Sequence, residues 1–226
     1  MSATERTERL LGAAALEKLR QAHVTVAGLG GVGGTACEAL VRAGVGHLHL
    51  IDPDTVAESN LNRQLFAVKS TLGLKKTEAA RLRLTDAGDA VLTLCPERVT
   101  DGNAADLIPP DTDCILDAID DIPAKVALIK LGAARGIPVI SCLGAGNRLD
   151  PTAFTVTDLF KTEGDPLARR LRQLLRKEGI DRLTVVFSKE TPAKSAPGGP
   201  VGSYAPVTGA AGLAAAGAVI QTILKE

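Results

Sequence analysis

A glycine-rich turn between a strand pattern and a helix pattern constrains the fold of this chain most strongly. Residues 23–28 (HVTVAG) form a β-branched run that ends at glycine, and residues 34–44 (GTACEALVRAG) have helical apolar spacing. GLGGVG at 28–33 joins them, and a second strand pattern, HLHLID, follows at 47–52. A parallel crossover through a helix takes about 30 residues, so this stretch predicts one strand–helix–strand unit.

Strand and helix patterns continue to alternate as far as residue 142. Helix patterns occur at 74–88 and 124–136, and strand patterns occur at 91–94, 114–119 and 137–142. Strands that alternate with helices are typical of a mostly parallel sheet covered on both faces. The sequence therefore predicts an α/β fold with a Rossmann-like nucleotide-binding domain, extended by further strands and a C-terminal helix.

The pattern changes after residue 150, where the predicted core ends. Strand patterns follow at 152–159 and 183–188, with a basic helix pattern at 165–179 between them. A loop rich in Pro, Gly and Ser then spans 191–206, and an Ala-rich helix pattern spans 207–224. No linker divides the chain, so we expect a single domain. Its parts are an amphipathic helix at 5–20, a core at 21–150 and a C-terminal extension at 151–226.

The last apolar stretch is long enough to raise the question of a membrane span. Residues 195–224 carry no charge, but they are mainly Ala and Gly, which contribute little transfer free energy, and Pro and Gln221 interrupt them. We therefore expect a buried helix, with a subunit interface as its candidate location, and no membrane anchor.

Composition excludes several classes of protein. Hydrophobic residues make up 45% of the 226 residues, and 26 basic residues balance 26 acidic ones, so neither a disordered chain nor a uniformly basic nucleic-acid binder is expected. Four Phe and one Tyr are too few for the extended stacking surface of a single-strand binder. The N-terminus lacks the apolar core of a secretory signal, so we expect a cytoplasmic protein.

The cysteines are scattered and form no CxxC pair. They are Cys37, Cys95, Cys114 and Cys142. This spacing argues against a disulfide framework and against a tetrahedral zinc site. Because they fall on a helix pattern or in and beside strand patterns, we interpret all of them as small buried hydrophobes rather than exposed nucleophiles.

The glycine-rich turn has the pattern of a phosphate-binding loop. Glycines there permit a tight turn and a close approach of backbone N–H groups to phosphate, at the positive end of the following helix. Asp52 ends the next strand pattern, where an acid can accept hydrogen bonds from a ribose. The alternative is a tight helix–strand contact without any ligand.

Polar residues after Asp52 favour a triphosphate over a dinucleotide. They are Asp54, the segment SNLNRQ at 59–64, the lysine pair at 75–76 and the acidic cluster DAIDD at 117–121. Because the carboxyl ends of parallel strands line the ligand crevice of such sheets, we expect these groups to meet there. Arginine, lysine and a metal-binding aspartate stabilise the charge that develops during phosphate chemistry.

These segments together resemble the ubiquitin-activating-enzyme-like superfamily, which includes bacterial sulfur-carrier adenylyltransferases. The matching segments are GLGGVG (28–33), DPD (52–54), SNLNRQ (59–64), GLKK (73–76) and DAIDD (117–121). One branch, the tRNA threonylcarbamoyladenosine dehydratases, is also similar outside them. Its further matches are RTERLLG (6–12), LIDPDTVAESNLNRQ (50–64), GLKKTEA (73–79), residues 145–177 and VVFSKETP (185–192).

The resemblance implies a set of ATP-binding residues in the crevice. The set is Gly28, Gly30, Gly31, Gly33, Asp52, Asp54, Ser59, Asn60, Arg63, Lys76, Asp120 and Asp121. Within it, Asn60, Arg63 and Lys76 are implied to contact the phosphates, and Asp120 to hold Mg²⁺ and position the α-phosphate. Lys76 is preferred to Lys75 on alignment alone. Some members of the superfamily also bind a monovalent cation.

The resemblance also implies a homodimer. Arg6 matches an arginine that reaches across the dimer interface into the partner's triphosphate in this superfamily, and Arg9 is the fallback assignment. The alternative for Arg6 is an ordinary exposed charge on a terminal helix. Asp117 and Asp121 have a comparable alternative, which is to cap the helix that follows them.

The implied reaction is the activation of a carboxylate by ATP. The threonyl carboxylate of threonylcarbamoyladenosine in tRNA is adenylated, and the neighbouring carbamoyl group then closes a ring and expels AMP, helped by its proximity. Residues 161–194 hold nine basic and five acidic residues, and Arg169, Arg172 and Arg176 share a helical face that could contact tRNA phosphates. The alternative for that face is a solvated surface.

Three other functions stay open. The first is an adenylyltransferase for the C-terminus of a ubiquitin-like or sulfur-carrier protein. Residues 202–206 lack the cysteine that some dehydratases carry, and the two-pair zinc motif of the sulfur-carrier enzymes is missing, so both absences disfavour sulfur transfer. The second is a module that binds a nucleotide and regulates a partner such as a cysteine desulfurase. The third is an NAD-dependent oxidoreductase, in which Arg63 has no role.

Overall fold

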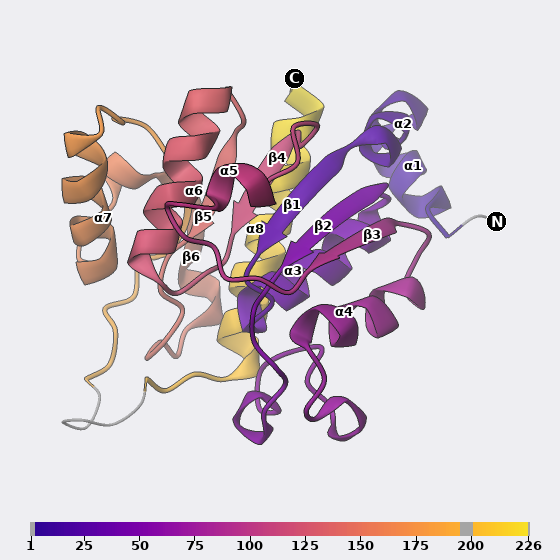
Figure 1. Ribbon diagram of the computed structural model, residues 1–226, viewed down its shortest axis with the longest axis horizontal. Helices are drawn as coiled ribbons and strands as arrows, with labels where there is room; N and C mark the ends of the chain where they lie inside the picture. The colour runs from indigo at the N-terminus through magenta and orange to yellow at the C-terminus, as the bar shows by residue number, and fades with distance from the viewer. Residues whose placement is uncertain (1–2, 195–200, 226) are drawn as a thin grey trace.

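The computed structural model describes residues 3–194 and 201–225, which build a seven-stranded sheet between two layers of helices (Figure 1). The strand order is β3-β2-β1-β4-β5-β7-β6, and all neighbouring strands are parallel except β7 and β6. The strands are β1 His23–Ala27, β2 His47–Ile51, β3 Val91–Cys95, β4 Cys114–Asp117, β5 Val139–Cys142, β6 Phe154–Asp158 and β7 Thr184–Ser188. The predicted α/β fold with a mostly parallel sheet is therefore confirmed.

Helices from both halves of the chain cover the two faces of the sheet. One face carries α2 Ala13–Gln21, α3 Gly31–Ala43, α4 Lys76–Thr85 and α8 Ala205–Lys225; the other carries α5 Ala104–Leu107, α6 Ile122–Arg135 and α7 Pro166–Lys177. Adjacent residues of β4, Ile115 and Leu116, belong to the cores on opposite faces. This alternation arises because successive side chains of a strand point to opposite sides.

Within the described residues, four short 3₁₀ helices lie in three of the connections between these elements. They are Glu58–Asn60, Lys69–Thr71, Pro151–Ala153 and Leu159–Lys161. The first two lie between β2 and α4, where they form the small lobe at the bottom of Figure 1. The lobe follows the carboxyl end of β2, and it contains the segment SNLNRQ.

The N-terminal helix is broken, so the prediction of one helix at 5–20 is wrong. α1 Glu5–Leu11 ends at Gly12, whose φ of 90° and ψ of 156° interrupt the helix before α2 begins. Glycine permits this break because it adopts positive φ at no steric cost. Leu16 and Leu19 of α2 are buried, as the apolar spacing predicts, whereas α1 buries none of its residues and leaves Leu10 83% exposed.

The Ala-rich C-terminal helix packs against the core. α8 has 21 residues and a mean hydropathy of 1.6, so by length and composition it could cross a membrane. It instead lies close along α3: a Cβ on Gly212 would sit 2.5 Å from the Val32 carbonyl oxygen, and one on Gly31 would sit 2.7 Å from Thr208 Oγ1. Its inward residues join the core, as predicted for a buried helix. Residues 195–200 of the loop predicted at 191–206 lie outside the described residues.

Candidate functional site

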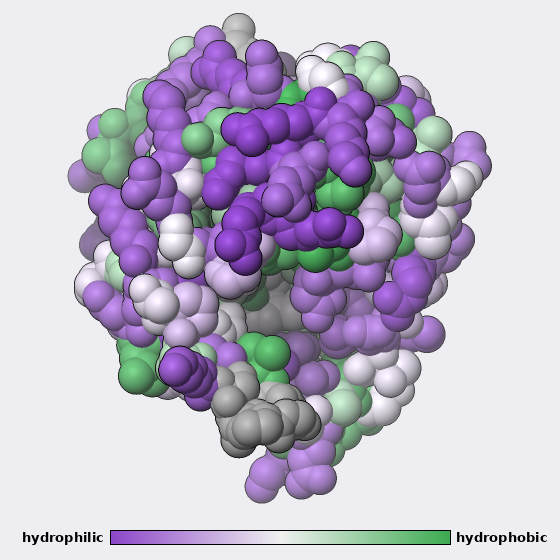
Figure 2. Space-filling view, turned by 90° about the vertical axis from the view of Figure 1, so that its left-hand side faces the viewer, coloured by the Kyte–Doolittle hydropathy of each residue, from purple (hydrophilic) through white to green (hydrophobic). Residues whose placement is uncertain are grey.

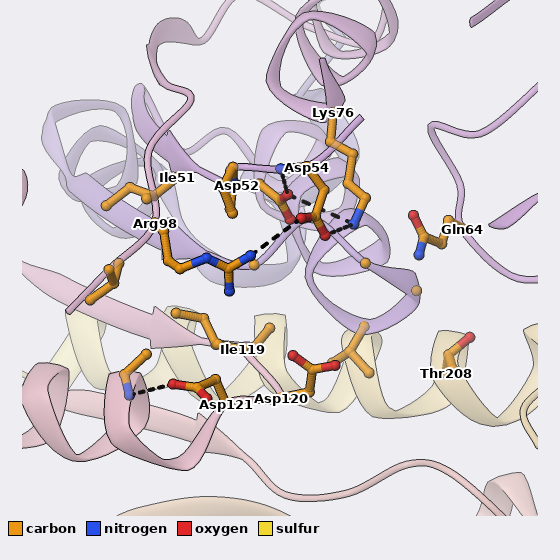
Figure 3. A pocket seen from close by; sticks show the side chains of 18 of the residues that line it. Ile51, Asp52, Asp54, Gln64, Lys76, Arg98, Ile119, Asp120, Asp121 and Thr208 are labelled. Carbon is orange, nitrogen blue, oxygen red and sulfur yellow. Dashed lines mark hydrogen bonds and ion pairs between the residues drawn. The ribbon is translucent and has the colours of Figure 1, made fainter. Parts of the chain in front are cut away.

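A cavity of about 230 Å³ opens at the carboxyl edge of the sheet, where β1, β2 and β4 end (Figure 3). Its wall combines the glycine-rich turn, the strand ends, the loop after β3 and the start of α8. The lining residues are Gly28, Gly30, Gly31, Val32, Ile51, Asp52, Pro53, Asp54, Arg63, Gln64, Lys76, Glu97, Arg98, Val99, Ala118, Ile119, Asp120, Asp121, Ala124 and Thr208. Folding therefore brings together most of the residues that the sequence implicates in ATP binding.

Backbone atoms exclude a side chain at two positions of the glycine-rich turn. Gly28 has a φ of +92°, and a Cβ there would lie 2.6 Å from the Ala118 carbonyl oxygen. A Cβ on Gly33 would lie 1.8 Å from the Gly28 carbonyl oxygen, so Gly33 closes the turn without lining the cavity. Gly30 and Gly31 face the cavity at the N-terminus of α3. Free N–H groups and the helix dipole favour an anion at such a terminus.

Asp52 ties the glycine-rich turn to the end of β2. Its side chain is buried, its Oδ2 accepts the Leu29 N–H at 2.7 Å, and its Oδ1 accepts the Asp54 N–H at 2.9 Å. A carboxylate oxygen has more than one lone pair, so Asp52 retains the capacity to accept a further hydrogen bond from a ligand in the cavity. This arrangement suits the ribose contact that the sequence predicts.

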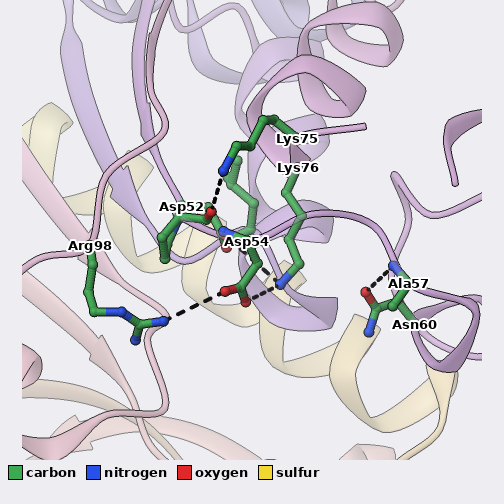
Figure 4. A network of polar contacts seen from close by, with 9 residues as sticks. Asp52, Asp54, Ala57, Asn60, Lys75, Lys76 and Arg98 are labelled. Atoms are coloured by element: carbon green, nitrogen blue, oxygen red, sulfur yellow. Dashed lines mark hydrogen bonds and ion pairs between the residues drawn. The ribbon is translucent and has the colours of Figure 1, made fainter. Parts of the chain in front are cut away.

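A network of ion pairs crosses the cavity (Figure 4). Lys76 Nζ lies 2.9 Å from Asp54 Oδ2 and 3.7 Å from Asp52 Oδ1, and Arg98 reaches Asp54 Oδ1 at 3.8 Å. Lys75 points elsewhere and donates to the Pro53 carbonyl oxygen at 3.0 Å. Lys76, which is 8% exposed, is thus the lysine of the pair that the fold places in the cavity wall.

Of the SNLNRQ segment, the structure brings Arg63 and Gln64 to the cavity but leaves Ser59 and Asn60 outside its lining. Arg63 donates to the Ser59 carbonyl oxygen at 3.0 Å and to Asn62 Oδ1 at 2.8 Å. Asn60 Oδ1 accepts the Ala57 N–H at 3.0 Å and so closes the local turn (Figure 4). Asn60 instead borders a shallow neighbouring pocket together with the lysine pair at 75–76.

The three acids at the end of β4 and just beyond it, Asp117, Asp120 and Asp121, take three different roles. Asp121 Oδ2 accepts the Ala124 N–H at 2.9 Å and caps α6, so the capping interpretation is confirmed for this residue (Figure 3). Asp120 lines the cavity, and within the described part of the chain its carboxylate makes no hydrogen bond or ion pair. Asp120 is therefore the acid that is free to contact a ligand or a metal ion.

Asp117 does not cap the helix, and that alternative is wrong for this residue. Its side chain is fully buried, and Lys125 Nζ donates to its Oδ2 at 2.9 Å. Ser141 Oγ donates to the same oxygen at 2.6 Å, and Lys125 also donates to the Cys142 carbonyl oxygen at 2.7 Å. Asp117 Oδ1 accepts the Ile119 N–H at 3.2 Å, so this buried cluster supports the loop that carries Asp120.

Sequence reasoning missed Glu97, Arg98 and Thr208 in the cavity wall. Glu97 and Arg98 follow β3, and the rule that carboxyl ends of parallel strands share one edge could have located them. Thr208 comes from α8, and no local pattern links that helix to the glycine-rich turn. Lys125 was also missed, although a lysine on the apolar side of a helix pattern is a signal for a buried ion pair.

Arg6 and Arg9 lie on α1, away from the cavity of their own chain. The N-terminal segment packs at the opposite edge of the sheet: Leu16 and Thr4 approach Gly44, just before β2 begins. Arg9 pairs with Glu5 at 2.5 Å, and Arg6 is exposed. Neither arginine is among the cavity's lining residues.

All four cysteines are buried, which confirms the interpretation as small hydrophobes. Burial raises the pKa of the Cys37 thiol far above its ordinary value. Burial likewise raises the pKa of Cys142 to about 12, against a smaller lowering by Lys125. Because the thiolate is the nucleophile, these two groups are unreactive in the folded chain.

The basic helix, α7, lies on the side of the molecule that faces the viewer in Figure 2, where hydrophilic side chains dominate the surface. Of the three arginines predicted to share one face, Arg169 and Arg176 are exposed, and Arg176 also lies over the Phe160 ring at 5.6 Å. Arg172 departs from that prediction because it is half-buried and donates to the carbonyl oxygens of Leu159 and Thr162 at 3.2 and 2.8 Å. It fixes a turn instead of facing solvent.

Comparison with known proteins supports the family resemblance that the sequence motifs indicate, over almost the whole chain. The profile of the ThiF family matches residues 4–226. The chain is 40% identical over 189 residues to the tRNA threonylcarbamoyladenosine dehydratase of Bacillus subtilis, which is 83% of this chain and 74% of that protein. It is 40% identical over 173 residues to the enzyme of that name from Escherichia coli, but this match spans only 65% of that protein.

The fold agrees with a solved structure as well. The crystal structure of E. coli tRNA N6-threonylcarbamoyladenosine dehydratase, TcdA, in complex with ATP matches with a TM-score of 0.93 and 35% identity, over 99% of this chain and 94% of that one. The shared fold, the sequence identity and the family profile agree with one another. This chain therefore belongs to the ThiF family.

Proposed function

We propose that this chain uses ATP to adenylate and cyclise the threonyl carboxylate of threonylcarbamoyladenosine in tRNA. The observation that carries the proposal is the cavity, in which a phosphate-type glycine turn, three cationic side chains and an aspartate with no protein partner among the described residues converge. Relatives with 40% identity are named for this dehydration, and the E. coli relative was solved with ATP bound. The proposal places the reaction in the cytoplasm, where tRNA and ATP are both present.

The distribution of the lining residues supports one proposed orientation of ATP in the cavity. The N-terminus of α3 and its glycine N–H groups face the phosphates, while Asp52 accepts a ribose hydroxyl. Ile51, Val99 and Ile119 supply an apolar wall for the adenine ring. Lys76 and Arg63 then contact the phosphates, and Lys76 exchanges its carboxylate partner for a phosphate oxygen.

Asp120 fits the Mg²⁺ that the superfamily uses. Its carboxylate lines the cavity without a protein partner in the described chain, and that chain offers no group of three metal-ligating side chains. Mg²⁺ is typically bound by one or two carboxylates together with substrate phosphates, which matches a single free aspartate. The ion would neutralise charge on the phosphates while the α-phosphate is attacked.

The proposed reaction has two steps. A threonyl carboxylate oxygen attacks the α-phosphorus of ATP, the bond to the β-phosphate oxygen breaks, and pyrophosphate leaves. The carbamoyl oxygen or nitrogen then attacks the activated carbonyl carbon, the ring closes, and AMP departs with the former carboxylate oxygen. Both groups belong to one substrate, so proximity replaces an enzyme nucleophile. The buried cysteines are consistent with a mechanism that needs no thioester.

A homodimer would complete the site. Arg6 stands at the far edge of the sheet from its own cavity, so a role at a triphosphate would require the cavity of a second copy. Leu10 and Leu11 on the same helix are exposed, which suits a protein contact. Within this proposal Arg6 stabilises charge on the triphosphate in trans.

The basic side of the molecule is the proposed tRNA surface. Basic residues in 161–194 that are exposed are Lys161, Arg169, Arg170, Arg176, Lys177, Arg182, Lys189 and Lys194. One acid of this segment, Asp165, is neutralised by a buried ion pair with Arg148, and Arg172 is itself half-buried, so the exposed groups keep the excess of positive charge that the composition gives. Such a surface would contact phosphates without reading sequence.

The test is incubation of the protein with Mg-ATP and tRNA that carries threonylcarbamoyladenosine. We expect AMP and pyrophosphate, and a loss of the mass of one water from the modified nucleoside. Asp120→Ala should bind ATP and fail to turn over, which separates an enzyme from a regulatory module that only binds nucleotide. If ATP consumption ignores this tRNA and responds to a small protein that ends in Gly-Gly, an adenylyltransferase replaces the proposed function.

A further inference from the structure

A small apolar surface beside the nucleotide cavity has no part in the reaction above. It consists of Leu149, Val201 and Tyr204, whose exposed fractions are 68%, 67% and 38%. We call these three residues the Tyr204 patch. A Cβ on Gly146 would lie 2.2 Å from Val201 Cγ1, so Val201 is seated against the loop that carries Leu149. Apolar side chains that are clustered and exposed commonly mark a binding surface.

Hydrogen bonds hold the Tyr204 patch in place. Tyr204 Oη donates to the Leu149 carbonyl oxygen at 2.5 Å, and the Leu149 N–H donates to the Glu190 carboxylate at 2.9 and 3.0 Å. Gly202 donates its N–H to Asn147 Oδ1 at 2.7 Å and accepts the Asn147 N–H at the same distance. The ring is thus fixed at the surface by its hydroxyl and by its backbone.

The patch adjoins the nucleotide cavity. The Tyr204 carbonyl oxygen accepts the Thr208 N–H at 3.3 Å, and Thr208 lines the cavity one helical turn away. On the other side, Asn62 Nδ2 donates to the Ser203 carbonyl oxygen at 2.9 Å, and Asn62 precedes Arg63 of the cavity wall. A group that rests on the Tyr204 patch therefore lies beside the wall of the nucleotide cavity.

Tyr204 differs from the other aromatic residues of the chain, all of which lie in its described part. Phe66 and Phe187 are buried, and Phe154 and Phe160 are half-buried, so Tyr204 alone presents an exposed ring. A single ring cannot form the extended stacking surface that the composition excludes. It can hold one flat group, however, and every nucleobase has a face that stacks on an aromatic ring.

We propose that Tyr204 stacks on one nucleobase of the RNA substrate and so directs the modified adenosine toward the cavity. This inference rests on the proposed function. The basic surface holds phosphates and cannot orient a particular nucleotide, because phosphate contacts carry no base information. Single-stranded loops of RNA present unstacked bases that proteins hold on aromatic rings. The Tyr204 patch supplies such a ring at the cavity.

The chain offers a direct spectroscopic test, because it contains one tyrosine and no tryptophan. Intrinsic tyrosine fluorescence therefore reports on Tyr204 alone. Titration with a stem-loop RNA that carries threonylcarbamoyladenosine in its loop, without ATP, should quench this emission. A fully paired duplex of equal charge should bind the basic surface with little quenching. Quenching by ATP alone, or equal quenching by the duplex, would overturn the proposal.

Variants provide the second readout. Tyr204→Ala should raise the KM for the stem-loop RNA about tenfold, within the range of one lost stacking contact, and leave the KM for ATP unchanged. Tyr204→Phe keeps the ring and should retain most of the RNA affinity. Leu82→Ala is the matched control, since Leu82 is an exposed apolar residue (52%) on α4 that should not affect either constant.

The outcomes separate this inference from the proposed function. If the RNA stimulates AMP formation but Tyr204→Ala leaves its KM unchanged, the stacking role fails and the dehydration stands. If the RNA quenches the tyrosine but no AMP forms, the dehydration fails and the Tyr204 patch is still a base-binding surface. If the RNA neither binds nor quenches, the stacking role is wrong.

Discussion

Replacing Lys125 by methionine should destabilise the protein far more than replacing an exposed lysine of the same helix. The Lys125 side chain is 1% exposed, and its ammonium donates to Asp117, Ser141 and the Cys142 carbonyl oxygen at 2.9, 3.3 and 2.7 Å. Lys125→Met leaves the fully buried Asp117 carboxylate without a counter-ion. Breaking such a pair costs about 3–5 kcal/mol.

That loss converts into a large change in melting temperature. For a domain of roughly 150–250 residues, each kcal/mol lowers the Tm by about 2–4 °C, so Lys125→Met should lower it by about 6–20 °C. Thermal and urea unfolding followed by circular dichroism measure both quantities. Lys130→Met on α6 is the matched control, because Lys130 is 37% exposed and its pairs with Asp101 and Glu178 are 3.3 and 3.7 Å long. Such surface pairs contribute about 0–1 kcal/mol.

A double variant keeps the reasoning testable if Lys125→Met does not fold. Asp117→Asn combined with Lys125→Met removes both charges, and Asn can still accept the Ile119 N–H that Asp117 accepts at 3.2 Å. We expect the double variant to recover more than half of the lost stability, since the uncompensated charge is the main cost. Two results would refute the argument: a free energy of unfolding of Lys125→Met within about 1 kcal/mol of that of the original chain, or a double variant that is no more stable than the single one.

Three further results follow from the same structure. Gly33→Ala should abolish ATP binding and lower the free energy of unfolding by about 1–3 kcal/mol, because its Cβ would lie 1.8 Å from a carbonyl oxygen. Gly217→Ala on α8 is the control, because a Cβ there has open space. It should raise the free energy of unfolding, measured by urea titration, by about 0.5–1 kcal/mol. All four thiols should resist iodoacetamide at about pH 8 in the native protein and react in urea, because they are buried. Mass spectrometry counts the labelled cysteines, and rapid labelling of any thiol in the native protein would contradict the prediction. Arg170→Gln should reduce the salt dependence of tRNA binding by about one unit of log–log slope, whereas Arg172→Gln should lower the Tm because Arg172 fixes a turn.

Local sequence patterns were sufficient for most of the fold. The β-branched run before GLGGVG and the alternation after it predict the parallel sheet, because strand and helix periodicities differ and each is set by side chains a few residues apart. The same reasoning places Asp52, Lys76 and Asp120 at one edge of the sheet. It fails at the N-terminal helix, where the positive φ of Gly12 overrides the apolar spacing on both sides.

Contacts between distant segments required the folded chain. Thr208 reaches the cavity through the packing of α8 on α3, and Asp117 finds Lys125 and Ser141 through the pairing of β4 with β5. The Tyr204 patch likewise joins residues more than fifty positions apart by hydrogen bonds. Periodicity reports only which side of an element is buried. Which groups meet there depends on how the elements pack, and that packing sets the partners of every buried charge.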